Sequence, residues 1–255
     1  MINEYEIKLR CQSKEPPNWF WGYNLYGALM QKLPPETIER LHASGLSPLS
    51  QYVMVDKASD ILTWHVTVTG DISGEIEEVL SRTGEYTLEG HDARLVVLDY
   101  QKTAAKSHAG FARFYLHEAP ASRRIRLSTM TPVSFKSGGE YVFFPTVELI
   151  YKSAVQKWNA FAESITIEDE EALGQLIGNT RIVSYRLGSF YYQIKGVKIP
   201  SFFGDITLFV KGPEALVRLA DLLLHYLSSS GLGIKCALGM GGIKTADCSA
   251  QSAQK

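Results

Sequence analysis

The stretch that decides the fold is Gly231-Leu232-Gly233-Ile234-Lys235-Cys236-Ala237-Leu238-Gly239-Met240-Gly241-Gly242. Five glycines at this density permit positive φ and let another backbone approach closely, and the N–H groups of the turn are then free to cradle an anion such as phosphate. The last glycine is not directly followed by a Lys-Ser/Thr pair, because Ile243 comes next, and a helical pattern precedes the stretch. It is therefore neither a nucleotide-hydrolase phosphate loop nor the opening of a dinucleotide-binding unit. The plain alternative is an ordinary turn between a helix and a strand.

Strands and helices alternate in the second half of the chain, outward from this stretch. Apolar spacing predicts a strand over Arg124–Met130, a helix over Pro145–Glu163, a hairpin of Ile182–Val197 with Ser201–Val210, a helix over Pro213–Leu227 and a last strand near Ile243. The acidic run Glu168–Glu171, followed by Gly174 and Gly178, predicts a surface connection.

The first half shows a similar order. The pattern predicts strands over Glu4–Cys11, Tyr52–Val55, Leu62–Val68 and Ala93–Tyr100, and helices over Trp19–Leu33, Glu36–His42 and Ile72–Leu80. With one extra helical turn this is β-α-β-β-α-β, the ferredoxin-like order. We therefore predict an α+β protein of tandem ferredoxin-like (RRM-like) domains with a C-terminal glycine-rich loop. The predicted domains are residues 1–120 and 121–255, joined near Glu118–Ser122.

Composition narrows the class of protein. The 255 residues are 45% hydrophobic, enough for a substantial core, and the N-terminus has no signal-peptide pattern. No apolar run approaches the ~20 residues that span a membrane. The three cysteines, Cys11, Cys236 and Cys248, have no metal-ligand spacing. We expect a cytoplasmic protein with no metal, no cofactor and no membrane partner.

Charge is distributed unevenly along the chain. Residues 1–120 hold 11 Lys/Arg and 16 Asp/Glu, a net charge of −5, whereas residues 121–255 hold 15 and 11, a net charge of +4. A local basic face is what phosphate binding requires, and the overall charge of −1 conceals it. The alternative is an ordinary solvated surface.

Several segments together resemble one family. Gly231–Gly241 is similar to the C-terminal signature of the RAMP superfamily, and Leu127–Lys136 to its strand that enters a Thr-Pro pair. The helix after Pro145, ending in Lys157-Trp158-Asn159, is similar to its next block, and Gly22–Leu33 with Leu41-His42 resembles its N-terminal helix and catalytic-histidine region. Within the superfamily the chain most resembles the CRISPR-associated endoribonuclease that cuts precursor CRISPR RNA within its repeats.

The resemblance implies catalysis without a metal, because the RNA supplies its own nucleophile, the 2′-hydroxyl. A histidine can move protons at neutral pH, and the chain has six: His42, His65, His91, His108, His117 and His225. His42 lies at the end of a predicted helix, where the dipole favours an imidazolium. On its own this pattern is typical of a surface or capping histidine. The resemblance places His42 on the family's catalytic histidine.

The other catalytic positions depart from the family. Met30 stands where a tyrosine is common, and Tyr26, one turn earlier on the same face, is our candidate in its place. Leu46-Ser47-Pro48 stands where some relatives carry a lysine, which leaves Lys57 and Arg40 as the neighbouring cations.

The predicted RNA-binding residues flank the glycine-rich stretch and the Thr-Pro segment. They are Arg123, Arg124, Arg126, Lys136, Gly231, Gly233, Lys235, Gly239, Gly241 and Lys244. Tyr191, Tyr192, Phe202 and Phe203 are candidates to stack on bases, or else core residues.

Three functions are weighed. The first is metal-independent endoribonuclease cleavage of CRISPR repeat RNA, with repeat RNA as partner; the resemblance is compatible with other effector subunits and with a homodimer. The second is a non-catalytic RNA-binding subunit of an effector complex, favoured by the departures at Met30 and Leu46. The third, a small-molecule enzyme on the same fold, has no acid pair or cofactor motif in its support.

Overall fold

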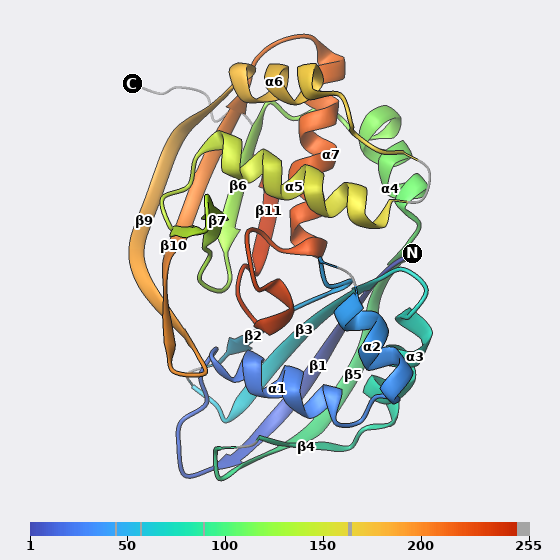
Figure 1. The fold of residues 1–255 in the computed structure, drawn as a ribbon, viewed down its shortest axis with the longest axis vertical. Coiled ribbons are helices and arrows are strands. Elements are labelled where there is room, and N and C mark those ends of the chain that lie inside the picture. The colour runs from blue at the N-terminus through green and yellow to red at the C-terminus, as the bar shows by residue number, and fades with distance from the viewer. Residues whose placement is uncertain (44, 57, 89, 163–164, 249–255) are drawn as a thin grey trace.

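The computed structural model describes residues 1–43, 45–56, 58–88, 90–162 and 165–248. The molecule has two lobes, one around each β-sheet (Figure 1). The lower lobe in that view carries the first half of the chain and the upper lobe the second. The glycine-rich stretch lies between them.

The first sheet has the strand order β2-β3-β1-β5-β4. Its strands are β1 (Ile2–Ser13), β2 (Leu49–Val55), β3 (Ile61–Thr69), β4 (Glu85–Leu88) and β5 (Ala93–Lys106), and its helices are α1 (Trp21–Met30), α2 (Pro35–Ala43) and α3 (Ser73–Arg82). Tyr5, Ile7 and Leu9 of β1 alternate inward against more exposed charged neighbours, as a sheet with one covered face requires. If the short edge strand β4 is set aside, the antiparallel order is that of a ferredoxin-like sheet.

The second sheet repeats this plan with the order β11-β6-β10-β9. Its strands are β6 (Arg124–Thr129), β9 (Thr180–Ile194), β10 (Val197–Val210) and β11 (Ile243–Asp247), and its helices are α5 (Val147–Phe161), α6 (Glu170–Asn179) and α7 (Glu214–Ser230). A separate hairpin is formed by β7 (Phe135–Ser137) and β8 (Glu140–Val142). The prediction of an α+β fold with tandem ferredoxin-like halves is confirmed.

Each sheet has its own apolar core. The first core joins β1 and β3 to α1 and α3 around Trp21, Trp64 and Leu25. The second joins β6 and β10 to α5 and α7 around Trp158, Ile206 and Leu223. Between β5 and β6, α4 (His108–Arg113) and the π-helical turn Phe114–Glu118 pack on the second core through Phe111 and Ala112. The predicted division at residue 120 stays a prediction.

The prediction of a surface connection over the acidic run Glu168–Glu171 is wrong. Asp169 accepts hydrogen bonds from the N–H groups of Glu171 and Ala172 and so caps the start of α6. The helix dipole stabilises acidic residues in the first turn, and the side chain of Leu176 is buried where α6 packs on the second core. The acidic run is therefore a helix start, although Gly174 and Gly178 pointed to a loop. Strand β4 and helix α4 were not predicted.

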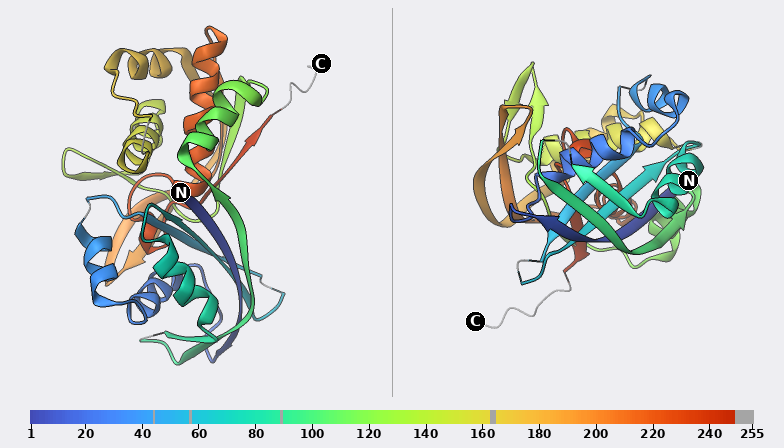
Figure 2. Two further views of the ribbon diagram at one scale, coloured as in Figure 1. Left: turned by 90° about the vertical axis from the view of Figure 1, so that its right-hand side faces the viewer. Right: turned by 90° about the horizontal axis from the view of Figure 1, so that it is seen from below.

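The two lobes meet at the glycine-rich stretch (Figure 2), where the side chain of one buried amide bonds to it. The buried Gln51 of β2 donates from Nε2 to the carbonyls of Gly22 (2.7 Å) and Ala237 (3.0 Å), and its Oε1 accepts from Trp64 Nε1 (2.8 Å). Because an unpaired buried amide is costly, these bonds fix the position of the stretch against α1 and β2. Among the described residues, no helix is long and apolar enough to cross a membrane.

Candidate functional site

The glycine-rich loop, residues 231–242, starts where α7 ends. Gly231 takes φ 73° and donates its N–H to Leu227 O, the usual end of a helix at a glycine. Leu232 N bonds to Gly241 O at 2.8 Å and closes the loop on itself. A single 3₁₀ turn, Cys236–Leu238, forms its tip.

Close approach explains the glycines at two positions. Gly239 has φ 93°, and a Cβ there would lie 3.1 Å from the Cα of Gly22 in α1. A Cβ on Gly233, at φ 77°, would collide with the carbonyl of Ser134. Side chains are excluded here by both conformation and space.

The N–H groups of the four predicted RNA-binding glycines are bonded within the protein and are not free to cradle an anion. Gly231 donates to Leu227 O, Gly233 to Ser153 Oγ, Gly239 to Cys236 O and Gly241 to Pro132 O. Within the described loop, only the N–H groups of residues 235–237 lack a protein acceptor. The predicted RNA-binding glycines therefore shape the loop, and its tip is the part that offers N–H donors.

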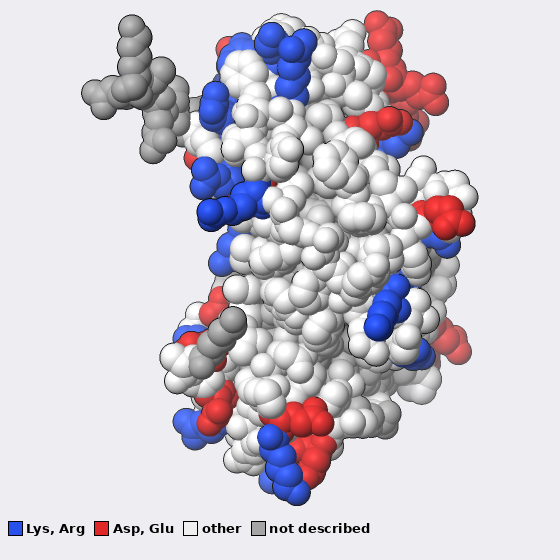
Figure 3. Space-filling view, turned by 90° about the vertical axis from the view of Figure 1, so that its left-hand side faces the viewer, with Lys and Arg blue, Asp and Glu red and all other residues white. Residues whose placement is uncertain are grey.

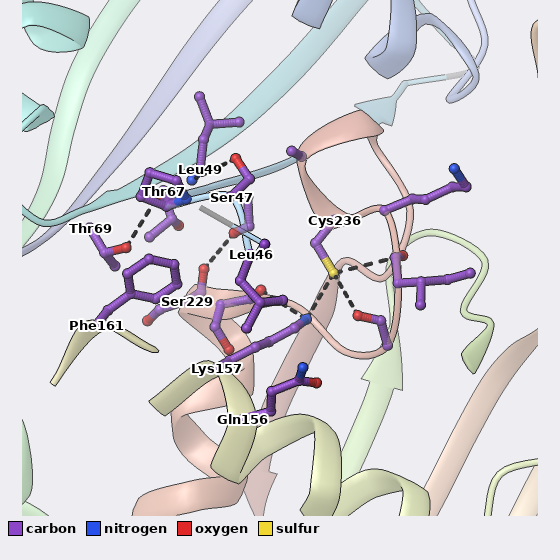
Figure 4. A pocket seen from close by; sticks show the side chains of 18 of the residues that line it. Leu46, Ser47, Leu49, Thr67, Thr69, Gln156, Lys157, Phe161, Ser229 and Cys236 are labelled. Atoms are coloured by element: carbon purple, nitrogen blue, oxygen red, sulfur yellow. Dashed lines mark hydrogen bonds between the residues drawn. The ribbon is translucent and has the colours of Figure 1, made fainter. Parts of the chain in front are cut away.

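A cavity of about 440 Å³ lies beside the loop, between the lobes (Figure 4). Its walls are the segment 45–50 that follows α2, the end of β3, the last turns of α5, and the loop from Ser229 to Ala237. Lys136 and Lys235 line it with exposed side chains. Ser50 Oγ donates to Ser229 O across the lobes at 2.6 Å.

Lys157 was missed by the sequence analysis. Its side chain reaches from α5 into the cavity wall, is only 6% exposed, and contacts Gly231 O (2.7 Å), Ser230 O (3.2 Å) and Cys236 Sγ (2.9 Å). Three acceptors match the three donors of an ammonium group. The signal was available: Lys157 is the charged member of the apolar stripe Ile150, Ala154, Lys157 and Phe161, at helical spacing.

His42 lies in the last turn of α2 and is exposed. The chain continues from it to Gly45, the first residue of the cavity wall. Helix α2 is anchored on the far side, where Arg40 bonds to Asp71 and Glu75, each at 2.7 Å, and Thr37 bonds to Glu75. Arg40 is thus held by carboxylates, and Lys57 lies outside the described residues.

Tyr26 is half-buried on α1 and packs with Met30 against the first core. Burial raises the pKa of its phenol above the ordinary value. Among the described residues no hydrogen bond joins Tyr26 to His42. Its assignment as a catalytic residue stays a prediction.

The predicted RNA-binding cations fall into separate groups. Lys136 and Lys235 line the cavity. Arg124, Arg126 and Lys244 are exposed on the face of the second sheet that α5 and α7 leave uncovered, because their inward neighbours Ile125, Leu127 and Ile243 enter the core. Arg123 belongs to neither group, since it bonds to the carbonyls of Val210 and Gly212.

The surface agrees with the uneven charge of the sequence. Figure 3 shows Lys and Arg side chains gathered along one edge of the upper lobe, whereas acidic side chains lie at its opposite edge and, beside Lys and Arg, at the foot of the lower lobe. Of the four aromatic candidates for base stacking, Tyr192 and Phe202 are buried and thus core, while Tyr191 is 63% exposed.

Comparison with known proteins points to one family. A family model described as "CRISPR-associated endoribonuclease Cas6" matches residues 127–243. A protein of that name from Mycobacterium tuberculosis is 27% identical over 228 residues, 88% of this chain and 71% of the relative. Another from Streptococcus thermophilus is 29% identical over 220 residues, 86% of this chain and 88% of the relative.

The chain is similar to Cas6 proteins over most of its length. A solved Cas6 product complex is 21% identical in sequence, with a TM-score of 0.78 over 96% of this chain and 100% of the other. Thermus thermophilus Cas6, also 21% identical, gives a TM-score of 0.72 over 96% and 98%. At these identities the structures support the fold.

The segment matched by the Cas6 family model contains only part of the candidate site. Residues 127–243 include the loop with Lys235, the cavity residue Lys136 and the buried Lys157. His42 and Tyr26 lie before it, and so do the arginines at the start of β6. The roles of those residues therefore depend on the geometry described above.

Proposed function

We propose that this protein is a Cas6 endoribonuclease and that it cuts CRISPR repeat RNA by attack of a 2′-hydroxyl on the adjacent phosphate, without a metal ion. The P–O5′ bond breaks as the new P–O2′ bond forms, which leaves a 2′,3′-cyclic phosphate and a 5′-hydroxyl. One proton leaves the 2′-hydroxyl and one is delivered to the departing 5′-oxygen. The observation that carries the proposal is the cavity between the lobes, which joins the chain after His42 to the lysine-bearing loop.

His42 is the proposed proton-transfer residue. It is exposed at the end of α2, so a bound RNA can reach its ring, and an imidazole is suited to general acid or base catalysis. Lys235 and Lys136 border the same cavity and are placed to contact the charged phosphate. Tyr26 has a secondary role at most, because it is half-buried in the first core.

The direct test is cleavage of the host's own repeat RNA in EDTA. We expect a cut at a single repeat position, and none when the nucleotide 5′ of the cut carries a 2′-deoxy sugar. Strict dependence on Mg²⁺, or undiminished cutting of the deoxy substrate, would contradict the mechanism.

His42→Ala tests the site assignment. We expect single-turnover cleavage to slow by about 10²–10⁴-fold, with nearly unchanged affinity for the repeat. His117→Ala, which replaces an exposed histidine of the upper lobe, is the matched control and should cut as the wild type does. Near-normal cutting by His42→Ala would remove it from the mechanism.

Repeat RNA as the bound partner, and the cytoplasm as the place of action, are parts of the same proposal. Association with other effector subunits, or as a homodimer, stays a prediction. If the wild type binds its repeat tightly and never cuts it, the non-catalytic RNA-binding function replaces the proposed one.

A further inference from the structure

A cluster of two carboxylates and one imidazole lies in the upper lobe, away from the loop. Asp221 and His225 stand four residues apart on α7, and thus on one face of the helix. Asp247 comes from β11, which packs on α7 through a bond from Thr245 Oγ1 to Leu224 O (3.0 Å). Because strand side chains alternate, Asp247 points to the same side as Thr245.

The three side chains converge closely. One ligand atom from each lies within 4.8 Å of those from the other two. His225 Nε2 is 3.4 Å from Asp247 Oδ1. Two ligands bound tetrahedrally at 2.0–2.2 Å from one Zn²⁺ are separated by about 3.4 Å, so this pair already has the spacing of a metal site.

Asp221 supplies an independent sign that its surroundings suit a cation. Its side chain is only 2% exposed, and Oδ2 accepts from Ser122 N at 2.7 Å. Its other oxygen, Oδ1, is buried and has no hydrogen-bond partner among the described residues. The nearby Arg218 is bonded to Glu214 and to Ala119 O instead. A buried carboxylate oxygen without a donor is costly, and a metal ion would satisfy it.

His225 is oriented as a metal ligand. Its Nδ1 lies 2.9 Å from the carbonyl of Asp221, and since a carbonyl can only accept, Nδ1 carries the hydrogen. Nε2 is then left to present its lone pair toward the two carboxylates, as in metal-binding histidines. The ring of Tyr115 stacks on His225 with centroids 4.7 Å apart and holds its plane.

We propose that Asp221, His225 and Asp247 form a binding site for a divalent transition-metal ion, with Zn²⁺ as the best match. One nitrogen and two carboxylate ligands suit Zn²⁺ or Mn²⁺, whereas Mg²⁺ and Ca²⁺ prefer oxygen ligands throughout. The ion ties β11 to α7 and, through Asp221 and Ser122, to the chain that enters β6. Its role is to stabilise the upper lobe, so it is compatible with cleavage in EDTA.

The test is binding of ZnCl₂, and separately of MnCl₂, to EDTA-treated full-length protein. Metal analysis after equilibrium dialysis should find one equivalent bound, and thermal unfolding should shift upward with metal. His225→Gln and Asp247→Asn should each weaken binding about tenfold or more and abolish the shift. Circular dichroism should show both variants folded, because Asp247 is 55% exposed and His225 lies at the rim of the core.

Two further variants separate this site from other ligands. His91→Gln removes a histidine that also faces a carboxylate, Glu15, at 2.9 Å, and should bind metal as the wild type does. Cys248→Ser removes a thiol adjacent to Asp247 and should do the same. Absence of binding by the wild type, equal binding by Asp247→Asn and His225→Gln, or loss of binding in Cys248→Ser would each overturn the proposal.

Discussion

The side chain of Lys157 fixes the position of the glycine-rich loop at this site. Its amine bonds to the last carbonyls of α7 and to the thiol at the tip of the loop. Cations near a helix C-terminus are favoured by the dipole, and here the cation also satisfies two buried carbonyls. The residue therefore holds the loop in place from behind the cavity wall and is a positioning residue.

We expect Lys157→Met to lower the free energy of unfolding by about 1–3 kcal/mol, because two buried carbonyls lose their donor while the volume is kept. Urea unfolding measures this change. Lys152→Met is the matched control on the same helix: Lys152 is 59% exposed and pairs with Glu148, so its loss should cost about 0.5 kcal/mol or less. Equal effects of the two substitutions would contradict the role given to Lys157.

At the same scale, the sequence located single functional residues unevenly. His42 was predicted because a helix end and a family pattern coincide there, and its role stays a prediction. The Asp221, His225 and Asp247 cluster could not be found, since Asp247 is separated from the helix by the whole glycine-rich loop. Only the packing of β11 on α7 brings them together. Arg123 was predicted to bind RNA. The sequence around it does not reveal that its guanidinium donates to the backbone carbonyls of Val210 and Gly212.

Among the elements, the glycine-rich loop depends most on backbone conformation. We expect Gly233→Ala to lower the free energy of unfolding by more than about 1 kcal/mol, because alanine at positive φ is strained and its Cβ would meet Ser134 O. Repeat cleavage should fall with it as the loop shifts. Thermal unfolding and a cleavage time course are the measurements.

Gly174→Ala is the control for that substitution. Gly174 lies within α6, has no atom within 4 Å of an added Cβ, and alanine is the better helix former. The free energy of unfolding of the Gly174→Ala variant should stay the same or rise. If it falls as much as that of Gly233→Ala, the backbone conformation of the loop does not explain the effect at Gly233.

Periodic elements were the most predictable part of the fold. Strands β1, β3 and β10 and helices α1, α5 and α7 each bury one face, so spacing alone revealed them. Strand β4 has four residues, too few to show a period, and α6 was hidden by its two glycines. The hydrogen bonding of the loop could not be read from sequence, because its acceptors, such as Ser153 and Pro132, lie far away along the chain.

For the whole molecule, charge separation between the lobes predicts how binding depends on salt. We expect Lys235→Ala and Arg124→Ala each to weaken repeat binding and to reduce the slope of log K against log salt by about one. Each replaces a proposed phosphate contact, one at the cavity and one on the uncovered sheet face. Binding titrations over a range of salt concentrations measure this slope.

Lys14→Ala is the control for these titrations. Lys14 is 90% exposed in the acidic lower lobe, beside Asp92, and its removal should leave the slope unchanged. Unchanged slopes for both Lys235→Ala and Arg124→Ala would place the RNA on another surface.

The backbone contact between Gly22 and Gly239, together with the bonds of Gln51, has a consequence for the substrate. So tightly packed a joint opposes closure of the two lobes around a bound strand. The change of shape that brings the 2′-oxygen in line with the phosphate must then come from the RNA. We expect the protein to select repeats that unstack and bend easily at the cut. It would then distinguish one RNA from another by how easily each one deforms.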